Sequence, residues 1–178
     1  MVMDAAGNLY GVTTTGGLAN CFGNTCGVVF KLTPSSSGHW TETVLHKFTG
    51  GSDGYFPNSL IMDSAGNLYG TTPYGGGNGG QCNGGTGCGI VFKLSPRPTG
   101  PWPETVLYRF SGTDGAQPDA LAFDSLGNLY GTTGQRRGRQ RILRFCRAYR
   151  LRCSIPVDTH SQWSLDSHDR AHLPRYPL

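Results

Sequence analysis

An eight-residue motif occurs three times along this chain, and its spacing constrains the fold more than any other feature. The motif reads DAAGNLYG at 4–11, DSAGNLYG at 63–70 and DSLGNLYG at 124–131, so its starts are 59 and 61 residues apart. A period of this length is typical of similar structural units stacked in an array. The repeat therefore predicts a scaffold, and it assigns no specific biochemical activity.

Two further segments recur between the copies of this motif. GVVFKLTP at 27–34 returns as GIVFKLSP at 89–96, and TETVLHKF at 41–48 returns as PETVLYRF at 103–110. These matches divide an array over 1–134 into repeat 1 (4–62), repeat 2 (63–123) and a partial repeat 3 (124–134).

Each repeat holds four short runs of β-branched and aromatic residues bounded by Gly, Pro, Asn and Asp. In repeat 2 the runs are 60–62, 68–72, 90–94 and 104–110. Such runs are typical of strands, and no helical periodicity occurs in 1–134. Four antiparallel strands in about sixty residues describe one blade of a β-propeller. We expect an all-β fold: an incomplete propeller of about two four-stranded antiparallel blades, the start of a third, and an irregular Arg-rich tail.

The turn between the first two strands of each blade has a chemical explanation. Its aspartate can accept hydrogen bonds from the backbone of the turn, and its Gly and Asn tolerate positive φ. The expected turn residues are Asp4, Gly7, Asn8, Asp63, Gly66, Asn67, Asp124, Gly127 and Asn128. Calcium binding by a ring of these aspartates is the alternative, although no known calcium-loop pattern is present.

Recurring apolar residues indicate where the blades meet. We expect Val44, Phe48, Val106 and Phe110 to lie on faces between blades. The aromatic residues that recur once per blade fit the same packing role, with a glycan-stacking platform as the alternative. They are Tyr10, Tyr69, Tyr130, Trp40 and Trp102. Because two blades leave apolar faces uncovered, we expect the isolated chain to oligomerise, to aggregate or to fold marginally.

These motifs resemble the GloVer-type tandem repeat of bacterial secreted and surface proteins, which carry varied C-terminal anchors. The resemblance covers 4–123 twice over and 124–133 as the opening of a third copy. It implies a propeller-like fold and an extracellular or cell-surface location. It transfers no catalytic residue, because the family has no established activity.

Both ends depart from what the resemblance implies. Residues 1–4 align with 60–63, so the chain starts inside a strand and shows no export signal, and we expect a missing upstream region. After Gly134 the expected Gly-rich loop is replaced by 135–178, which holds 10 Arg, no Lys and one of the 28 Gly residues. We interpret this tail as a frameshift product outside the fold. The alternative is a basic arm that binds nucleic acid through phosphates.

Four of the six cysteines lie in matching loops. Cys21 and Cys26 precede the third strand of repeat 1, and Cys82 and Cys88 precede that of repeat 2. A cysteine pair across each hairpin favours a disulfide, which stabilises by about 2 kcal/mol for a short loop and implies an oxidising compartment. The alternative is a four-cysteine zinc site, which these spacings in separate blades do not favour. The tail cysteines, Cys146 and Cys153, receive no role.

The sequence predicts no enzyme. His39 and His46 are replaced by Pro101 and Tyr108 in repeat 2, so they suit packed or surface positions better than ligand positions. No catalytic, cofactor-binding or metal-ligating residue is assigned, and no cofactor or membrane span is expected. We expect a binding or scaffold fragment, with carbohydrate or another surface ligand and the missing blades as partners. A fragment of a propeller lyase or lactonase is the alternative, and it would need acid/base residues that converge from several blades.

Overall fold

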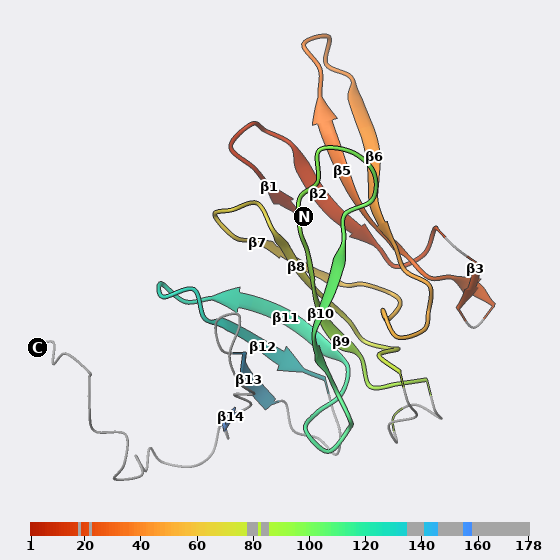
Figure 1. Cartoon of the computed structure of the whole chain (residues 1–178), viewed down its shortest axis with the longest axis vertical. Helices are drawn as coiled ribbons and strands as arrows, with labels where there is room; N and C mark the ends of the chain where they lie inside the picture. The colour runs from red at the N-terminus through yellow and green to blue at the C-terminus, as the bar shows by residue number, and fades with distance from the viewer. Residues whose placement is uncertain are drawn as a thin grey trace, which may run out of the picture.

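The fold consists of three four-stranded antiparallel sheets and one small hairpin. The computed structural model describes residues 1–17, 19–21, 23–77, 82, 86–134, 141–145 and 155–157. No helix occurs among these residues, which confirms the all-β prediction. Figure 1 shows the sheets side by side in chain order, from the orange first sheet through the yellow-green second sheet to the cyan third sheet.

The first sheet has the strand order β1-β2-β5-β6, in which β1 precedes repeat 1 and the other three strands lie within it. Its strands are β1 (Val2–Met3), β2 (Leu9–Thr13), β5 (Val28–Pro34) and β6 (Trp40–Lys47). A separate hairpin of β3 (Ala19–Cys21) and β4 (Asn24–Thr25) lies in the loop between β2 and β5. All neighbours in the four-stranded sheet pair antiparallel.

The second sheet repeats this arrangement with the strands predicted from the sequence. Its strands are β7 (Ser59–Met62), β8 (Leu68–Thr72), β9 (Ile90–Leu94) and β10 (Glu104–Arg109). Each strand pairs antiparallel with the next one along the chain. Each sheet is therefore a meander of the kind that forms a propeller blade, and we refer to the three sheets as blades 1 to 3.

Blade 3 extends beyond the expected end of the array. Its strands are β11 (Pro118–Phe123), β12 (Leu129–Thr133), β13 (Arg141–Phe145) and β14 (Ile155–Val157). We expected the tail to stay outside the fold, which would leave residues 129–133 without a hairpin partner. Instead β13 pairs with β12 along its whole length, and β14 pairs with β13. The free edge of β12 presents unpaired backbone N–H and C=O groups, and these can pair with a strand of almost any sequence. The rest of 135–178 lies outside the described residues.

The blades pack through their inner strands. Strand β7 contacts β1 and β2 of blade 1, and β11 contacts β7 and β8 of blade 2. Blade 2 is thus covered on both sides. Along β9, Ile90 and Phe92 pack into the core shared with blade 1, whereas Val91 packs into the core shared with blade 3. The rings of Phe48 and Phe92 meet edge to face across the first interface, with centroids 5.2 Å apart.

The interface face of β6 differs in part from the expectation. Phe48 and Phe110 are buried and Val106 packs against the core, but Val44 is 37% exposed while Leu45 is buried. The reason is a bulge in the β5–β6 pairing beside Leu45, together with the chain of blade 2, which passes over it. The Trp102 N–H donates a 2.8 Å hydrogen bond to the Leu45 carbonyl.

A second backbone hydrogen bond recurs between blade 1 and blade 2 and between blade 2 and blade 3. The N–H of Phe56 donates to the carbonyl of Cys26, and the N–H of Gln117 donates to the carbonyl of Cys88, both at 2.9 Å. Phe56 and Gln117 are the non-glycine residues with positive φ, at 59° and 51°, among the residues described. This uncommon conformation recurs at matching positions because it turns the chain from the loop after the fourth strand of one blade into the first strand of the next.

Candidate functional site

The repeated aspartate organises its own turn. In the first copy, Asp4 Oδ1 accepts the N–H groups of Ala6 and Asn8, at 3.0 and 2.9 Å. Asp4 Oδ2 accepts the side-chain amide of Asn8 at 2.7 Å and the hydroxyl of Tyr10 at 3.0 Å. Gly7, at φ 80°, closes the turn by donating its N–H to the Asp4 carbonyl. The motif residues Asp, Gly, Asn and Tyr thus form one hydrogen-bonded unit.

The other two copies repeat this geometry. Asp63 receives the same four donors at 2.8 to 3.0 Å, and Asp124 receives them at 2.7 to 3.1 Å. The amide of Asn8 and the other donors lower the pKa of Asp4, and those of Asn128 and its neighbours lower that of Asp124. Desolvation raises the pKa of Asp63, but its four donors outweigh this and lower it overall. With four N–H and O–H donors directed at each carboxylate, the geometry favours the turn role over a calcium ring.

Two disulfides close the loops between the second and third strands. Cys21 bonds to Cys26, and Cys82 bonds to Cys88, with Cα–Cα distances of 5.2 and 5.1 Å. These are the pairs that the sequence led us to expect, and the four sulfurs do not form a shared zinc site. All four residues are buried in the interfaces between blades. Cys146 and Cys153 lie outside the described residues.

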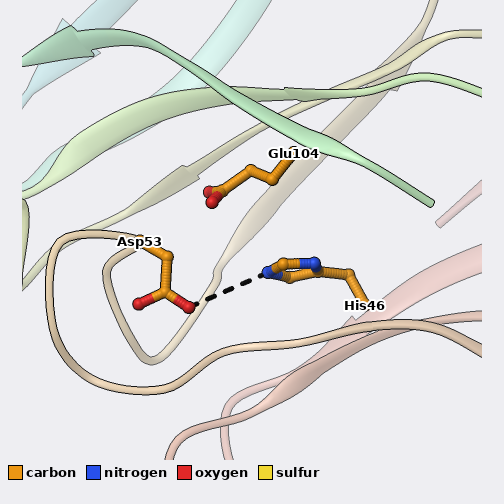
Figure 2. A group of neighbouring side chains, drawn as sticks. All are labelled: His46, Asp53 and Glu104. Atoms are coloured by element: carbon orange, nitrogen blue, oxygen red, sulfur yellow. Dashed lines mark ion pairs between the residues drawn. The ribbon is translucent and has the colours of Figure 1, made fainter. Parts of the chain in front are cut away.

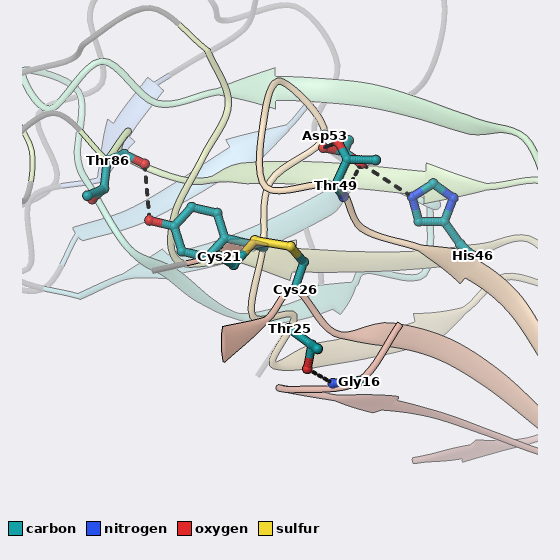
Figure 3. Close-up of a disulfide and its surroundings, with 9 residues drawn as sticks. Gly16, Cys21, Thr25, Cys26, His46, Thr49, Asp53 and Thr86 are labelled. Atoms are coloured by element: carbon teal, nitrogen blue, oxygen red, sulfur yellow. Dashed lines mark hydrogen bonds and ion pairs between the residues drawn. A yellow bond between two sulfur atoms is a disulfide. The ribbon is translucent and has the colours of Figure 1, made fainter. Parts of the chain in front are cut away.

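The first disulfide supports the turn at 49–54. Gly50 packs directly on Cys21 with φ 83°, so no side chain could be added there without displacing the sulfur. Asp53 holds the same turn from the other side, because its carboxylate accepts the N–H of Thr49 at 2.8 Å and the Thr49 hydroxyl at 2.6 Å. Figure 3 shows the disulfide, Thr49, Asp53 and His46 in one neighbourhood. The disulfide and Thr49 together fix the position of Asp53.

Asp53 belongs to a group of three ionisable side chains that spans blades 1 and 2. His46 comes from β6, Asp53 from the turn after β6, and Glu104 from the start of β10. Their ligand atoms lie within 4.8 Å of one another, and His46 Nε2 is 3.9 Å from Asp53 Oδ2. Figure 2 shows the three side chains pointing toward one another between the blades. We call this group the interblade triad.

The interblade triad is held in an electrostatically unfavourable environment. Burial, and then the charge of Asp53, raise the pKa of Glu104 to about 8, although Arg109 opposes the shift. Burial lowers the pKa of His46 despite the attraction of Asp53. His46 Nε2 and Glu104 Oε1 are buried and have no hydrogen-bond partner. Since buried polar atoms are almost always paired in folded proteins, two unpaired atoms at one point are unusual.

Blade 2 offers an internal comparison for this arrangement. At the positions of His46 and Asp53 it carries Tyr108 and Asp114. The Tyr108 hydroxyl donates a 2.7 Å hydrogen bond to Asp114, and Asp114 also accepts the N–H of Ser111 at 2.9 Å. The Tyr108 hydroxyl therefore forms a hydrogen bond with the carboxylate of blade 2, whereas His46 Nε2 in blade 1 lies 3.9 Å from Asp53 and makes no hydrogen bond.

A comparison of the whole sequence with known families assigns these repeats. The profile of the Gloeobacter/Verrucomicrobia repeat matches residues 2–142. The chain belongs to this family. No relative among curated proteins matches the sequence. The match covers blades 1 and 2, the first two strands of blade 3 and the first residues of the tail.

Within this Gloeobacter/Verrucomicrobia repeat array, the recurring aromatic residues are used for packing. Trp102 is buried against blade 1, with its ring 6.0 Å from that of Tyr10. Trp40, the matching residue of blade 1, is 50% exposed. Lys31 lies over the ring of Tyr10 and Lys93 over that of Tyr69, at 5.8 and 5.7 Å. The packing role thus fits Trp102, Tyr10 and Tyr69, and Trp40 is left accessible.

The sequence did not point to the interblade triad. His39 lies exposed in the hairpin between β5 and β6, away from this group. His46 has no histidine counterpart in repeat 2, and Glu104 recurs as the exposed Glu42. Only the packing of blade 2 on blade 1 brings Glu104 beside His46.

In the part of the chain that the structure describes, no helix is long and apolar enough to cross a membrane.

Proposed function

We propose that this chain is a non-enzymatic, extracytoplasmic repeat scaffold that presents a binding surface. The observation that supports this most directly is the use of the repeated polar residues. Each of the three motif aspartates is engaged by four donors from its own turn. Repetition in this family therefore preserves the geometry of a turn, and the repeated groups are not free to act on a substrate.

The two disulfides support a location outside the cytoplasm. Disulfides persist in oxidising compartments and are rare in cytosolic proteins. Both bonds close loops that pack between blades, and the carbonyls of Cys26 and Cys88 accept the hydrogen bonds that start the next blade. Their loss would loosen the interfaces between blades as well as two loops. A scaffold that depends on these bonds is suited to secretion or to the cell surface.

The exposed aromatic residue of blade 1 indicates one type of ligand. Trp40 lies at the start of β6 and is 50% exposed, whereas its counterpart Trp102 is buried. An accessible indole ring can stack on the apolar face of a sugar or cover a neighbouring blade. We propose carbohydrate or another surface ligand as the partner, with further blades of a longer array as the competing occupant of this position.

An enzyme of the propeller lyase or lactonase type is the second candidate. The observation that favours it is the interblade triad, in which burial raises the pKa of Glu104 to about 8 and lowers that of His46. Perturbed pKa values in one cluster are a feature of active sites. However, His46 and Glu104 lie on the fourth strands of blades 1 and 2, far in each meander from the inner strands β1 and β7. This position favours a structural role.

The first experiment tests the proposed location in cells that produce the protein. Intact cells are treated with a membrane-impermeant alkylating reagent, and the protein is mapped as peptides without reduction. We expect peptides joined through Cys21–Cys26 and Cys82–Cys88, with the protein accessible to external protease. Reduced cysteines and protection from protease would overturn the proposed location.

A second experiment tests the binding role against the two alternatives. The purified chain is applied to a glycan array beside Trp40→Ala, and both are assayed for lactone hydrolysis and polysaccharide cleavage. Glycan binding that is lost in Trp40→Ala, without turnover, supports the proposal. Turnover that depends on Glu104 would establish the enzyme instead. Salt-sensitive DNA binding that disappears on deletion of 135–178 would support nucleic-acid binding through the tail.

A further inference from the structure

We propose that the interblade triad of His46, Asp53 and Glu104 binds one divalent transition-metal ion, with Zn²⁺ as the representative ion, and that this ion joins blade 1 to blade 2. The proposal is independent of the scaffold role. It rests on the geometry of three ligand-bearing side chains from two blades, on two unpaired ligand atoms and on the groups that orient the ligands.

The donor set and its spacing suit such an ion. Zn²⁺ binds imidazole nitrogen and carboxylate oxygen at about 2.0–2.2 Å, which places neighbouring ligand atoms of a tetrahedral site about 3.4 Å apart. In this structure His46 Nε2 and Asp53 Oδ2 are 3.9 Å apart, and all three ligand atoms lie within 4.8 Å of one another. The ligand atoms therefore need to approach one another by about 1.4 Å or less. An imidazole ligand favours a transition metal over Ca²⁺ or Mg²⁺, which prefer oxygen ligands.

Two side-chain atoms of the interblade triad lack a hydrogen bond. His46 Nε2 and Glu104 Oε1 are both buried without a hydrogen bond. At the matching position of blade 2, the side chains of Tyr108 and Asp114 satisfy each other through a hydrogen bond. The triad has no such bond for these two atoms. A metal ion satisfies both atoms at once and compensates the charge of two carboxylates that face each other between the blades.

The groups around the triad orient it as metal ligands are usually oriented. Ligating carboxylates are usually themselves held by hydrogen bonds from neighbouring groups. The Trp102 segment passes beside His46, because its N–H donates a 2.8 Å hydrogen bond to the carbonyl of the adjacent Leu45. His46 Nε2 lies 3.9 Å from Asp53 Oδ2. Asp53 is oriented by Thr49 through two hydrogen bonds.

Arg109 completes the surroundings from the blade 2 side. Its guanidinium donates to the carbonyls of Ser52 and Gly76, which ties β10 to the turn that carries Asp53. Arg109 is thus engaged with backbone oxygens. The triad itself sums to two negative charges when both carboxylates are ionised, which a divalent ion neutralises.

The test measures Zn²⁺ binding to the full, oxidised chain. The background carries Cys146→Ser and Cys153→Ser, because free thiols in the tail would bind zinc themselves. Titration against a chromophoric chelator should give one Zn²⁺ per chain. At a free concentration one hundred times the Kd, the melting temperature should rise by about 5 °C. Co²⁺ should give visible d–d absorption without thiolate charge-transfer bands, and Ca²⁺ and Mg²⁺ at the same concentration should give no shift.

Matched variants locate the site. His46→Tyr introduces the residue that blade 2 tolerates at this position, so the variant should fold and should bind Zn²⁺ at least tenfold more weakly. Glu104→Gln should lose a similar factor. His39→Tyr, which removes an exposed histidine from the same blade, should bind as the parent does. Absence of a 1:1 site below about 1 mM, or parent-like binding by both His46→Tyr and Glu104→Gln, would overturn the proposal. An equal response to Ca²⁺ would overturn the choice of a transition metal.

Discussion

The side-chain amide of Asn58 donates a 3.1 Å hydrogen bond to the carboxylate of Asp119, and the two residues occupy the same position in successive repeats. A residue at this position of one repeat therefore contacts the equivalent residue of the next repeat. The buried hydroxyl of Thr71 lies 2.6 Å from Asn58 Oδ1 and 2.8 Å from the Asp119 carbonyl. Blades 2 and 3 are thus joined by a polar contact beside the apolar core, formed by the residue before β7, by Thr71 of β8 and by Asp119 of β11.

Replacement of Thr71 with valine tests this contact. The side chain is fully buried, and valine keeps its shape while it removes the hydroxyl. The variant removes the single hydroxyl proton that Asn58 Oδ1 and the Asp119 carbonyl share, so Thr71→Val should lower the free energy of unfolding by about 1–3 kcal/mol. The matched control is Thr132→Val, which alters the half-buried counterpart in blade 3 and should cost less. Chemical denaturation measures both, and equal effects would contradict the role of the interface.

The repeated turn gives a second prediction. Asp63→Ala removes the acceptor of four hydrogen bonds at once, whereas Tyr69→Phe removes one of them. We expect Asp63→Ala to cost about 2–3 kcal/mol and Tyr69→Phe about 1 kcal/mol. Ser64→Ala, at an exposed position of the same turn, is the control and should be close to neutral. If Asp63→Ala unfolds at the same denaturant concentration as Ser64→Ala, the aspartate is not the organiser of the turn.

Much of this fold could be predicted from the sequence, because the information is local and repeated. The strand runs of repeat 2 match β7 to β10 within one residue at each end. The Asx role of Asp63 follows from its place before a Gly-Asn pair. The cysteine pairs were also expected, because each pair lies within one loop.

The remaining features depend on contacts between blades, which no local pattern encodes. Glu104 is unremarkable in the sequence, and its counterpart Glu42 is exposed. It meets His46 only because blade 2 packs on the β6 side of blade 1. The burial of Leu45 in place of Val44 depends in the same way on a bulge and on the Trp102 segment. The pairing of β13 with β12 requires only a free backbone edge, so its arginine-rich composition gave no indication of a strand.

Stability should fall in acid because of the three turn aspartates. The pKa values of Asp4, Asp63 and Asp124 are lowered in the folded state. A lowered pKa means that the unfolded chain binds protons more tightly, so these groups stabilise the fold above pH about 4 and lose this effect as the pH falls through their folded values. Melting temperatures from pH 7 to pH 2 should drop most steeply below pH 4. In Asp63→Asn the drop should be shallower, and an identical pH profile would argue against this contribution.

The contact between Gly50 and the first disulfide gives the last prediction, for which the chain supplies a close control. Gly50 and Gly38 have nearly the same conformation, with φ of 83° and 81°. A Cβ added at Gly38 meets no atom within 4 Å, whereas one added at Gly50 meets the sulfur of Cys21. Alanine at either position bears the cost of positive φ, about 1 kcal/mol, so the difference between the two variants isolates the steric contact.

We expect the free energy of unfolding of Gly50→Ala to be lower than that of Gly38→Ala by at least about 1 kcal/mol, because the disulfide cannot move away from the 49–54 turn without disturbing the blade interface. The difference should shrink when Cys21 and Cys26 are both replaced with alanine. Equal stabilities of the two glycine variants in the oxidised protein would show that the turn does not rest on the disulfide, and Asp53 would then be positioned by Thr49 alone.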